Sequence, residues 1–136
     1  MQTNGVIQRK LALLDTQVQQ LAAALADVSL EIFTDDWILG SMAERALQVA
    51  AEIMIDIAVR IIAIRGAGPV VTATDAMKRL VSLGVIHDEK PYIDIVRFRN
   101  LIVHEYDKID PKILFELATS RLRDFAAFRD ELDKTL

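Results

Sequence analysis

The stretch RFRNLIVHEYDKIDP, residues 97–111, places two arginines, an asparagine, a histidine and a tyrosine in an otherwise apolar segment. A histidine side chain, whose unperturbed pKa is about 6.5, can accept or donate a proton at neutral pH. Arginine keeps its positive charge and presents a planar fork that suits a phosphate group. Because burying such groups without partners is costly, they belong either to a reactive site or to paired positions of a core helix.

A helix is predicted over most of this stretch, from about residue 91 to 103. On a wheel of about 100° per residue, Arg97, Asn100 and His104 fall within about 60° of one another. Arg99 lies about 140° from His104, so contact between them requires the arginine arm to wrap, the helix to end near the histidine, or a partner chain. Since its apolar residues point nearly all round, this helix is expected in the middle of a bundle.

A structural interpretation also accounts for these residues. A histidine near a helix C-terminus is stabilised by the helix dipole, and arginines on central helices often pair with acids on neighbouring helices. Tyr106, just beyond the helix, would then be a partly buried anchor whose hydroxyl group reaches water. Residue types and spacing alone leave both interpretations open.

The rest of the chain is predicted to form helices that would hold this stretch in place. Apolar residues recur at intervals of three and four, and side-chain oxygens and glycines mark helix starts and stops. We find no strand-like alternation, internal repeat or linker, so residues 1–136 are expected to be one all-α, up-and-down bundle of about five helices. The predicted helices span about residues 5–30, 36–64, 72–84, 91–103 and 111–132.

The composition excludes several classes of protein. The net charge of −4 and the pI of about 5.1 argue against an extended, non-specific nucleic-acid surface. The absence of cysteine rules out disulfides, zinc-thiolate sites and thiol nucleophiles. The most apolar run, residues 53–64, is too short to cross a bilayer and is interrupted by Asp56 and Arg60. With no signal peptide in the first residues, a cytoplasmic protein without membrane contact is expected.

Two segments carry a resemblance to a known family. RNLIVHEY, from Arg99 to Tyr106, resembles the Arg-x4-His-x-Tyr motif of HepT-type toxins. These are helical-bundle proteins of the HEPN superfamily, encoded beside a small nucleotidyltransferase antitoxin of the MNT class. The segment AERALQVAAEIMIDIA, from Ala43 to Ala58, is similar to the family's Glu-x-x-Leu-Gln-x-Ala-x-Glu-x-x-x-Asp pattern. Length and helix order also match, so the resemblance implies a HEPN-like fold.

The resemblance implies the toxin of a toxin-antitoxin pair, an endoribonuclease that cleaves tRNA or mRNA without a metal or other cofactor. It makes Arg99 and His104 the catalytic pair, with Asn100 as a positioning residue. It makes Tyr106 the tyrosine that the cognate antitoxin modifies with AMP. Arg97 remains open as the alternative catalytic arginine or as a supporting phosphate contact, because looser motifs of the superfamily allow its spacing. One His and one Arg are a small catalytic set, so a homodimer that doubles it is expected.

The second predicted helix carries polar residues at four-residue intervals, and these allow two interpretations. They form a solvated face with an ordinary Asp56 to Arg60 pair, or their polar groups orient Arg99 or His104 across the bundle. The residues concerned are Glu44, Gln48, Glu52 and Asp56. Two competing hypotheses for the whole chain are a non-catalytic helical module, which binds a nucleotide or pairs with a nucleotidyltransferase, and a purely structural bundle.

Overall fold

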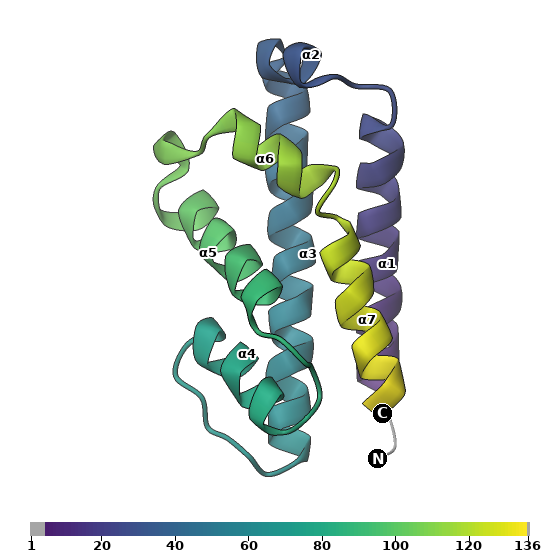
Figure 1. Ribbon diagram of the computed structural model, residues 1–136, viewed down its shortest axis with the longest axis vertical. Coiled ribbons are helices and arrows are strands. Elements are labelled where there is room, and N and C mark those ends of the chain that lie inside the picture. The colour runs from purple at the N-terminus through teal and green to yellow at the C-terminus, as the bar shows by residue number, and fades with distance from the viewer. Residues whose placement is uncertain (1–4, 136) are drawn as a thin grey trace.

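The computed structural model describes residues 5–135, and every regular element in that part of the chain is a helix (Figure 1). The predicted all-α class is therefore confirmed. The elements are α1 (Gly5–Leu25), α2 (Leu30–Asp35), α3 (Trp37–Ile64), α4 (Ala73–Ser82), α5 (Lys90–His104), the 3-10 helix η1 (Tyr106–Lys108), α6 (Pro111–Ala118) and α7 (Arg123–Thr135).

The central element is α3, a helix of 28 residues that contacts α1, α2, α4, α5 and α6. It begins at Asp36, whose Oδ1 accepts hydrogen bonds from the amides of Ile38 and Leu39 at 3.0 and 3.2 Å. It ends before Gly66, whose φ of 65° allows the chain to turn back. Four buried alanines along α3 let the neighbouring helices approach closely: Ala43, Ala50, Ala51 and Ala58.

The prediction that the helix over residues 91–103 is buried in the middle of the bundle is right for its first part and wrong for its last turn. The first part of α5 is buried, but its last turn passes the edge of the core, so that Val103 is 44% exposed. Arg97, Asn100 and His104 lie in solvent. The apolar residues around the whole helix gave a misleading signal, because those after Phe98 are only partly covered by neighbouring helices.

The number of helices also differs from the prediction. The first predicted helix ends early and a short extra helix, α2, forms in the segment expected to connect it to α3, whereas the last predicted helix is interrupted. Helix α1 ends at Leu25, and α2 starts after Ser29, whose hydroxyl accepts the amide of Ile32 at 3.2 Å. Residues 119–122 separate α6 from α7, and the Thr119 hydroxyl donates to the Phe115 carbonyl at 2.6 Å. This turn lets α7 run beside α1 (Figure 1).

A buried polar contact fixes α5 against α7. Tyr92 is almost fully buried, its ring packs edge-on against Phe128, and its hydroxyl donates to Glu131 at 2.5 Å. Burial and the nearby Glu131 carboxylate raise the pKa of Tyr92 well above its usual range, so this hydroxyl remains a donor. None of the described helices has the length and apolar character to cross a membrane.

Candidate functional site

Arg99 lies on the inward side of α5 and lines a small, mostly apolar cavity between α3, α5, α6 and α7. Its Nε is buried and has no hydrogen-bond partner among residues 5–135. A buried N–H group without a partner is rare, so the Nε of Arg99 is available to donate to an acceptor from outside the described residues. The other residues that line the cavity are Leu47, Ile95, Phe98, Ile102, Leu117, Arg121 and Phe125.

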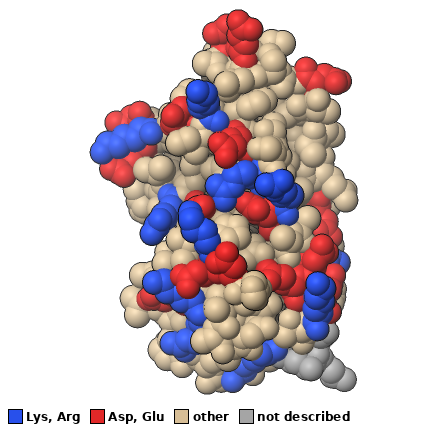
Figure 2. Space-filling view, viewed as in Figure 1, with Lys and Arg blue, Asp and Glu red and all other residues tan. Residues whose placement is uncertain are grey.

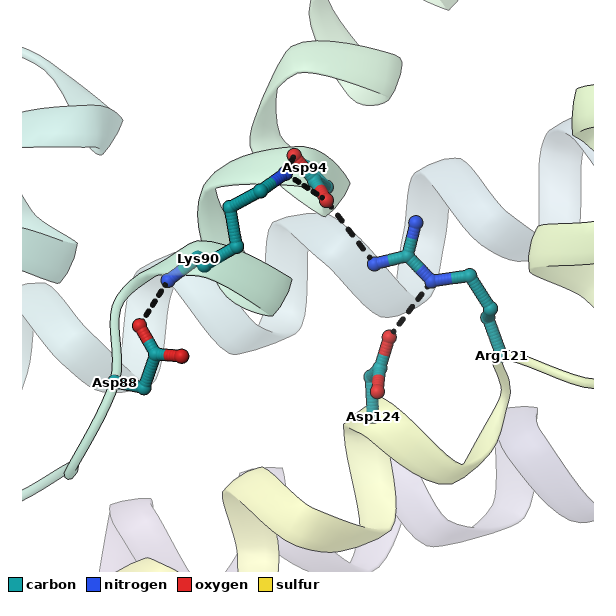
Figure 3. A network of polar contacts seen from close by, with 5 residues as sticks. All are labelled: Asp88, Lys90, Asp94, Arg121 and Asp124. Carbon is teal, nitrogen blue, oxygen red and sulfur yellow. Dashed lines mark hydrogen bonds and ion pairs between the residues drawn. The ribbon is translucent and has the colours of Figure 1, made fainter.

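The second cation of this cavity, Arg121, is held by two carboxylates (Figure 3). Its Nη2 lies 3.3 Å from Asp94 Oδ2, and its Nε lies 3.1 Å from Asp124 Oδ2. Lys90 also binds Asp94, at 2.8 Å. On the face of the molecule that Figure 2 presents, basic side chains gather across the middle with acidic side chains beside them. Because Arg121 already has two acidic partners, Arg99 is the cation of this cavity that remains open to an anion.

Sequence reasoning missed Arg121 and Asp94. They stand 27 positions apart, and the turn that brings them together is the one that interrupts the predicted last helix. No local spacing pattern connects them. The ion pair depends on the tertiary fold.

We expect Asp94→Asn to destabilise the protein by about 1–2 kcal/mol at pH 7. Burial alone would raise the pKa of Asp94, but hydrogen bonds and charge from Lys90 and Arg121 outweigh it and lower that pKa. A carboxyl group whose pKa is lowered by folding stabilises the folded state at pH values above its unfolded-state pKa, which is about 3.9 for Asp. This contribution is lost as the pH falls through the folded-state pKa. Urea unfolding of variant and parent protein should therefore differ at pH 7 and converge in acid, as the pH falls through the lowered folded-state pKa of Asp94.

The matched control for this prediction is Asp107→Asn. Asp107 is exposed in η1 and has no ion-pair partner among the described residues, so its replacement should change the stability little at either pH. If Asp94→Asn lowers the free energy of unfolding by the same amount at pH 7 and in acid, the stabilising role assigned to the negative charge of Asp94 is contradicted.

The other motif residues lie in solvent at the C-terminal end of α5. Arg97, Asn100 and His104 share the exposed face, as the wheel predicted, and His104 is the last residue of the helix. Tyr106 begins η1 two residues later and is 75% exposed. His104 is not among the residues that line the Arg99 cavity. Within one chain, Arg99 therefore faces inward while the histidine faces outward.

Tyr106 lines a second, open groove of about 230 Å³, formed by α2, the first turns of α3, η1 and α6. Trp37 and Glu44 line it as well. Burial raises the pKa of the Glu44 carboxyl, which is partly covered. Glu44 is one of the α3 residues predicted to orient the catalytic pair. It lines the same groove as Tyr106 and does not line the Arg99 cavity.

The remaining polar residues of α3 bind one another or α1. The Gln48 side chain donates to Glu52 at 3.4 Å. Asp56 lies 3.2 Å from Arg60, the pair that the spacing predicted, and 2.6 Å from Lys10 on α1. Lys10, together with Arg60, lowers the pKa of Asp56. That Gln48, Glu52 or Asp56 orients Arg99 or His104 stays a prediction. Among residues 5–135, His, Asp and Glu side chains do not gather in a group of three that could hold a metal ion.

The chain is similar to one protein family and to several solved structures. The family described as "Ribonuclease HepT-like" matches residues 14–132. Among solved structures, a tri-AMPylated HEPN toxin of Shewanella oneidensis in complex with an MNT antitoxin is 25% identical, with a TM-score of 0.89 over 97% of this chain and 99% of that one. A mutant MntA-HpeT toxin-antitoxin complex is 25% identical, with a TM-score of 0.85 over 96% and 99% of the two chains.

A toxin-antitoxin structure with AMP-PNP shares the fold, with a TM-score of 0.88 at 24% identity over 96% of this chain and 99% of that one. Among curated proteins, none matches the chain significantly. The family match covers most of the sequence, including both segments that carry the motifs. The chain therefore belongs to the HepT-like ribonuclease family, which confirms the resemblance seen in the sequence.

Proposed function

We propose that this chain is the toxin of a toxin-antitoxin pair and that it cleaves tRNA or mRNA internally, without a metal ion, as a homodimer. The observation that carries the proposal is the unpartnered, buried Nε of Arg99 five residues before the exposed His104. Both residues lie inside the segment that matches the HepT-like family. RNA cleavage without a metal needs a positive charge beside the phosphate and a group that transfers protons. Arg99 and His104 can supply them.

The proposed reaction is the attack of a ribose 2′-hydroxyl on the adjacent phosphorus. A base removes the 2′-hydroxyl proton, the new P–O bond forms, and the bond from phosphorus to the 5′-oxygen breaks as that oxygen takes up a proton. The products end in a 2′,3′-cyclic phosphate and a 5′-hydroxyl. His104 serves in proton transfer, and Arg99 stabilises the extra negative charge that develops on the phosphorus oxygens.

A homodimer supports this chemistry better than one chain does. Arg99 is half-buried and lines a partly open cavity between α3, α5, α6 and α7, whereas His104 is exposed at the helix end. A two-fold copy can place its own His104 near the Arg99 of its partner, so that the dimer holds two sites, each built from one residue of either chain. Asn100 and Arg97, exposed beside His104, are then available to position the RNA and to contact its phosphates.

Inactivation by AMP attachment fits the position of Tyr106. Its side chain is exposed and follows His104 by two residues, so an added nucleotide would bring a phosphate and a bulky group next to the catalytic histidine. The similar S. oneidensis toxin is tri-AMPylated in its complex with an MNT antitoxin, and this supports a nucleotidyltransferase of that class as the partner of this chain.

The test is RNA cleavage by the purified chain in the presence of EDTA. We expect equal cleavage with and without the chelator, products with 2′,3′-cyclic phosphate ends, and loss of cleavage after incubation with the antitoxin and ATP. A protein that never cuts RNA, yet binds ATP or the partner enzyme tightly, would instead be the non-catalytic module. Cleavage that stops on addition of EDTA and returns with a divalent cation would contradict the metal-independent mechanism.

A further inference from the structure

The groove beside Tyr106 has features that the cleavage of RNA does not use. Trp37, the first residue of α3, lines it and is 78% exposed. It is the only tryptophan in the sequence. An exposed indole ring at the wall of a groove offers a flat surface on which a nucleic-acid base can stack.

Glu44 supplies a second feature, about two turns beyond Trp37 along α3 and in the lining of the same groove. Its carboxyl is partly buried, and no hydrogen bond or ion pair satisfies it among residues 5–135. A carboxyl group in this state is suited to accept hydrogen bonds from hydroxyl or amino groups. The ribose hydroxyls and the amino group of adenine are donors of that kind.

The charges of the groove distinguish the two ends of a nucleotide. The acidic side chains that line it are Asp36, which caps α3, and Glu44, and no basic residue lines it. A phosphate is therefore disfavoured inside, whereas a neutral nucleoside is not. A nucleotide joined through its phosphate to the Tyr106 hydroxyl would keep the phosphate at the rim and direct its nucleoside inward.

We propose that this groove binds the adenosine of an AMP attached to Tyr106, with the adenine stacked on Trp37 and the ribose held by Glu44. The inference rests on the proposed function, since it requires that Tyr106 be the AMP acceptor. At about 230 Å³ the groove is smaller than the roughly 300 Å³ or more of ordinary small-molecule pockets. Free nucleotides should bind it weakly, and the covalent link makes occupancy effective by raising the local concentration to the millimolar range.

Docking of the adenosine would change the effect of the modification. A nucleotide that swings freely from Tyr106 would leave the space next to His104 open part of the time. One that is held by Trp37 and Glu44 keeps its phosphate fixed beside the histidine. The groove would thus convert a covalent tag into a continuous block of the RNA site.

The single tryptophan allows a direct test by fluorescence. The purified chain is treated with the antitoxin and ATP, freed of both, and checked by intact mass. We expect the emission of Trp37, excited where tyrosine does not absorb, to fall by roughly half or more, because a stacked base of ordinary strength covers the ring most of the time. Removal of the AMP with a phosphodiesterase should restore the emission. The Tyr106→Phe variant, treated in the same way, should show no change.

A second measurement compares modified variants. With AMP attached, Trp37→Ala and Glu44→Gln should retain more RNA cleavage than the modified parent chain, whereas Trp37→Phe, which keeps an aromatic ring, should remain blocked. A mass gain of AMP with unchanged Trp37 emission and equal residual cleavage in all variants would overturn this inference and leave the proposed function standing. No AMP addition to Tyr106 at all would overturn both this inference and the proposed role of Tyr106 as the AMP acceptor, whereas RNA cleavage would still be tested by the chelator experiment.

Discussion

Alanine at either Arg99 or His104 is expected to lower the rate of RNA cleavage by roughly 10²–10⁴-fold and to leave the fold intact. Removing His104 eliminates the group that transfers protons, and its exposed position makes a large loss of stability unexpected. Removing Arg99 eliminates the positive charge that stabilises the transition state. Cleavage of a labelled RNA is measured for each variant, with circular dichroism as the check on folding.

Matched controls are available within the chain. His87 is the only other histidine and is exposed in the loop before α5, so His87→Ala should cleave RNA at the parental rate. Arg97→Ala decides between the two candidate arginines. A strong loss there with little effect at Arg99 would make Arg97 the catalytic residue. Full activity of both the Arg99→Ala and the His104→Ala variants would contradict the proposed site.

Mixing the two inactive variants tests the dimer. If each site combines Arg99 of one protomer with His104 of the other, a heterodimer of Arg99→Ala and His104→Ala chains contains one intact site and one that lacks both residues. Activity should then return when the two proteins are unfolded and refolded together. Sites contained within single protomers would show no recovery, because every site would still lack one of the two residues.

Local signals predicted much of the fold. The cap at Asp36 and the positive φ of Gly66 place α3 where the sequence indicated it, and α4 is capped by Thr72, where the third predicted helix begins. The interruptions near residues 26–29 and 119–122 were missed, because the apolar periodicity continues through them. A short cap such as Ser29 is a weak signal against a pattern of that length.

The candidate site was predicted only in part, because sequence spacing does not show which helices pack together. The face shared by Arg97, Asn100 and His104 follows from helix geometry alone, which the sequence determines. The burial of that face depends on which helices surround α5, and the apolar periodicity does not show which helices these are. Arg121 at the Arg99 cavity and Trp37 near Tyr106 were missed because each comes from a distant segment that only the folded chain brings close.

Tyr106→Phe is expected to abolish AMP attachment and to leave RNA cleavage unchanged. The phenolic oxygen is the nucleophile of the proposed modification, and its removal from an exposed side chain should alter the stability by less than about 0.5 kcal/mol. Intact mass after co-expression with the antitoxin should show no AMP on the variant. Cells that carry the variant together with the antitoxin should stop growing, whereas cells with the parent chain should grow.

The other tyrosine of the chain is the matched control. Tyr92 is buried and donates to Glu131, so Tyr92→Phe should reduce the stability by about 1–3 kcal/mol, because Glu131 loses a hydrogen-bond partner, and should still accept AMP. AMP found on the Tyr106→Phe variant would place the acceptor elsewhere. Growth with an unmodified Tyr106→Phe variant would show that the antitoxin neutralises this chain by binding alone, because no covalent group would then stand beside His104.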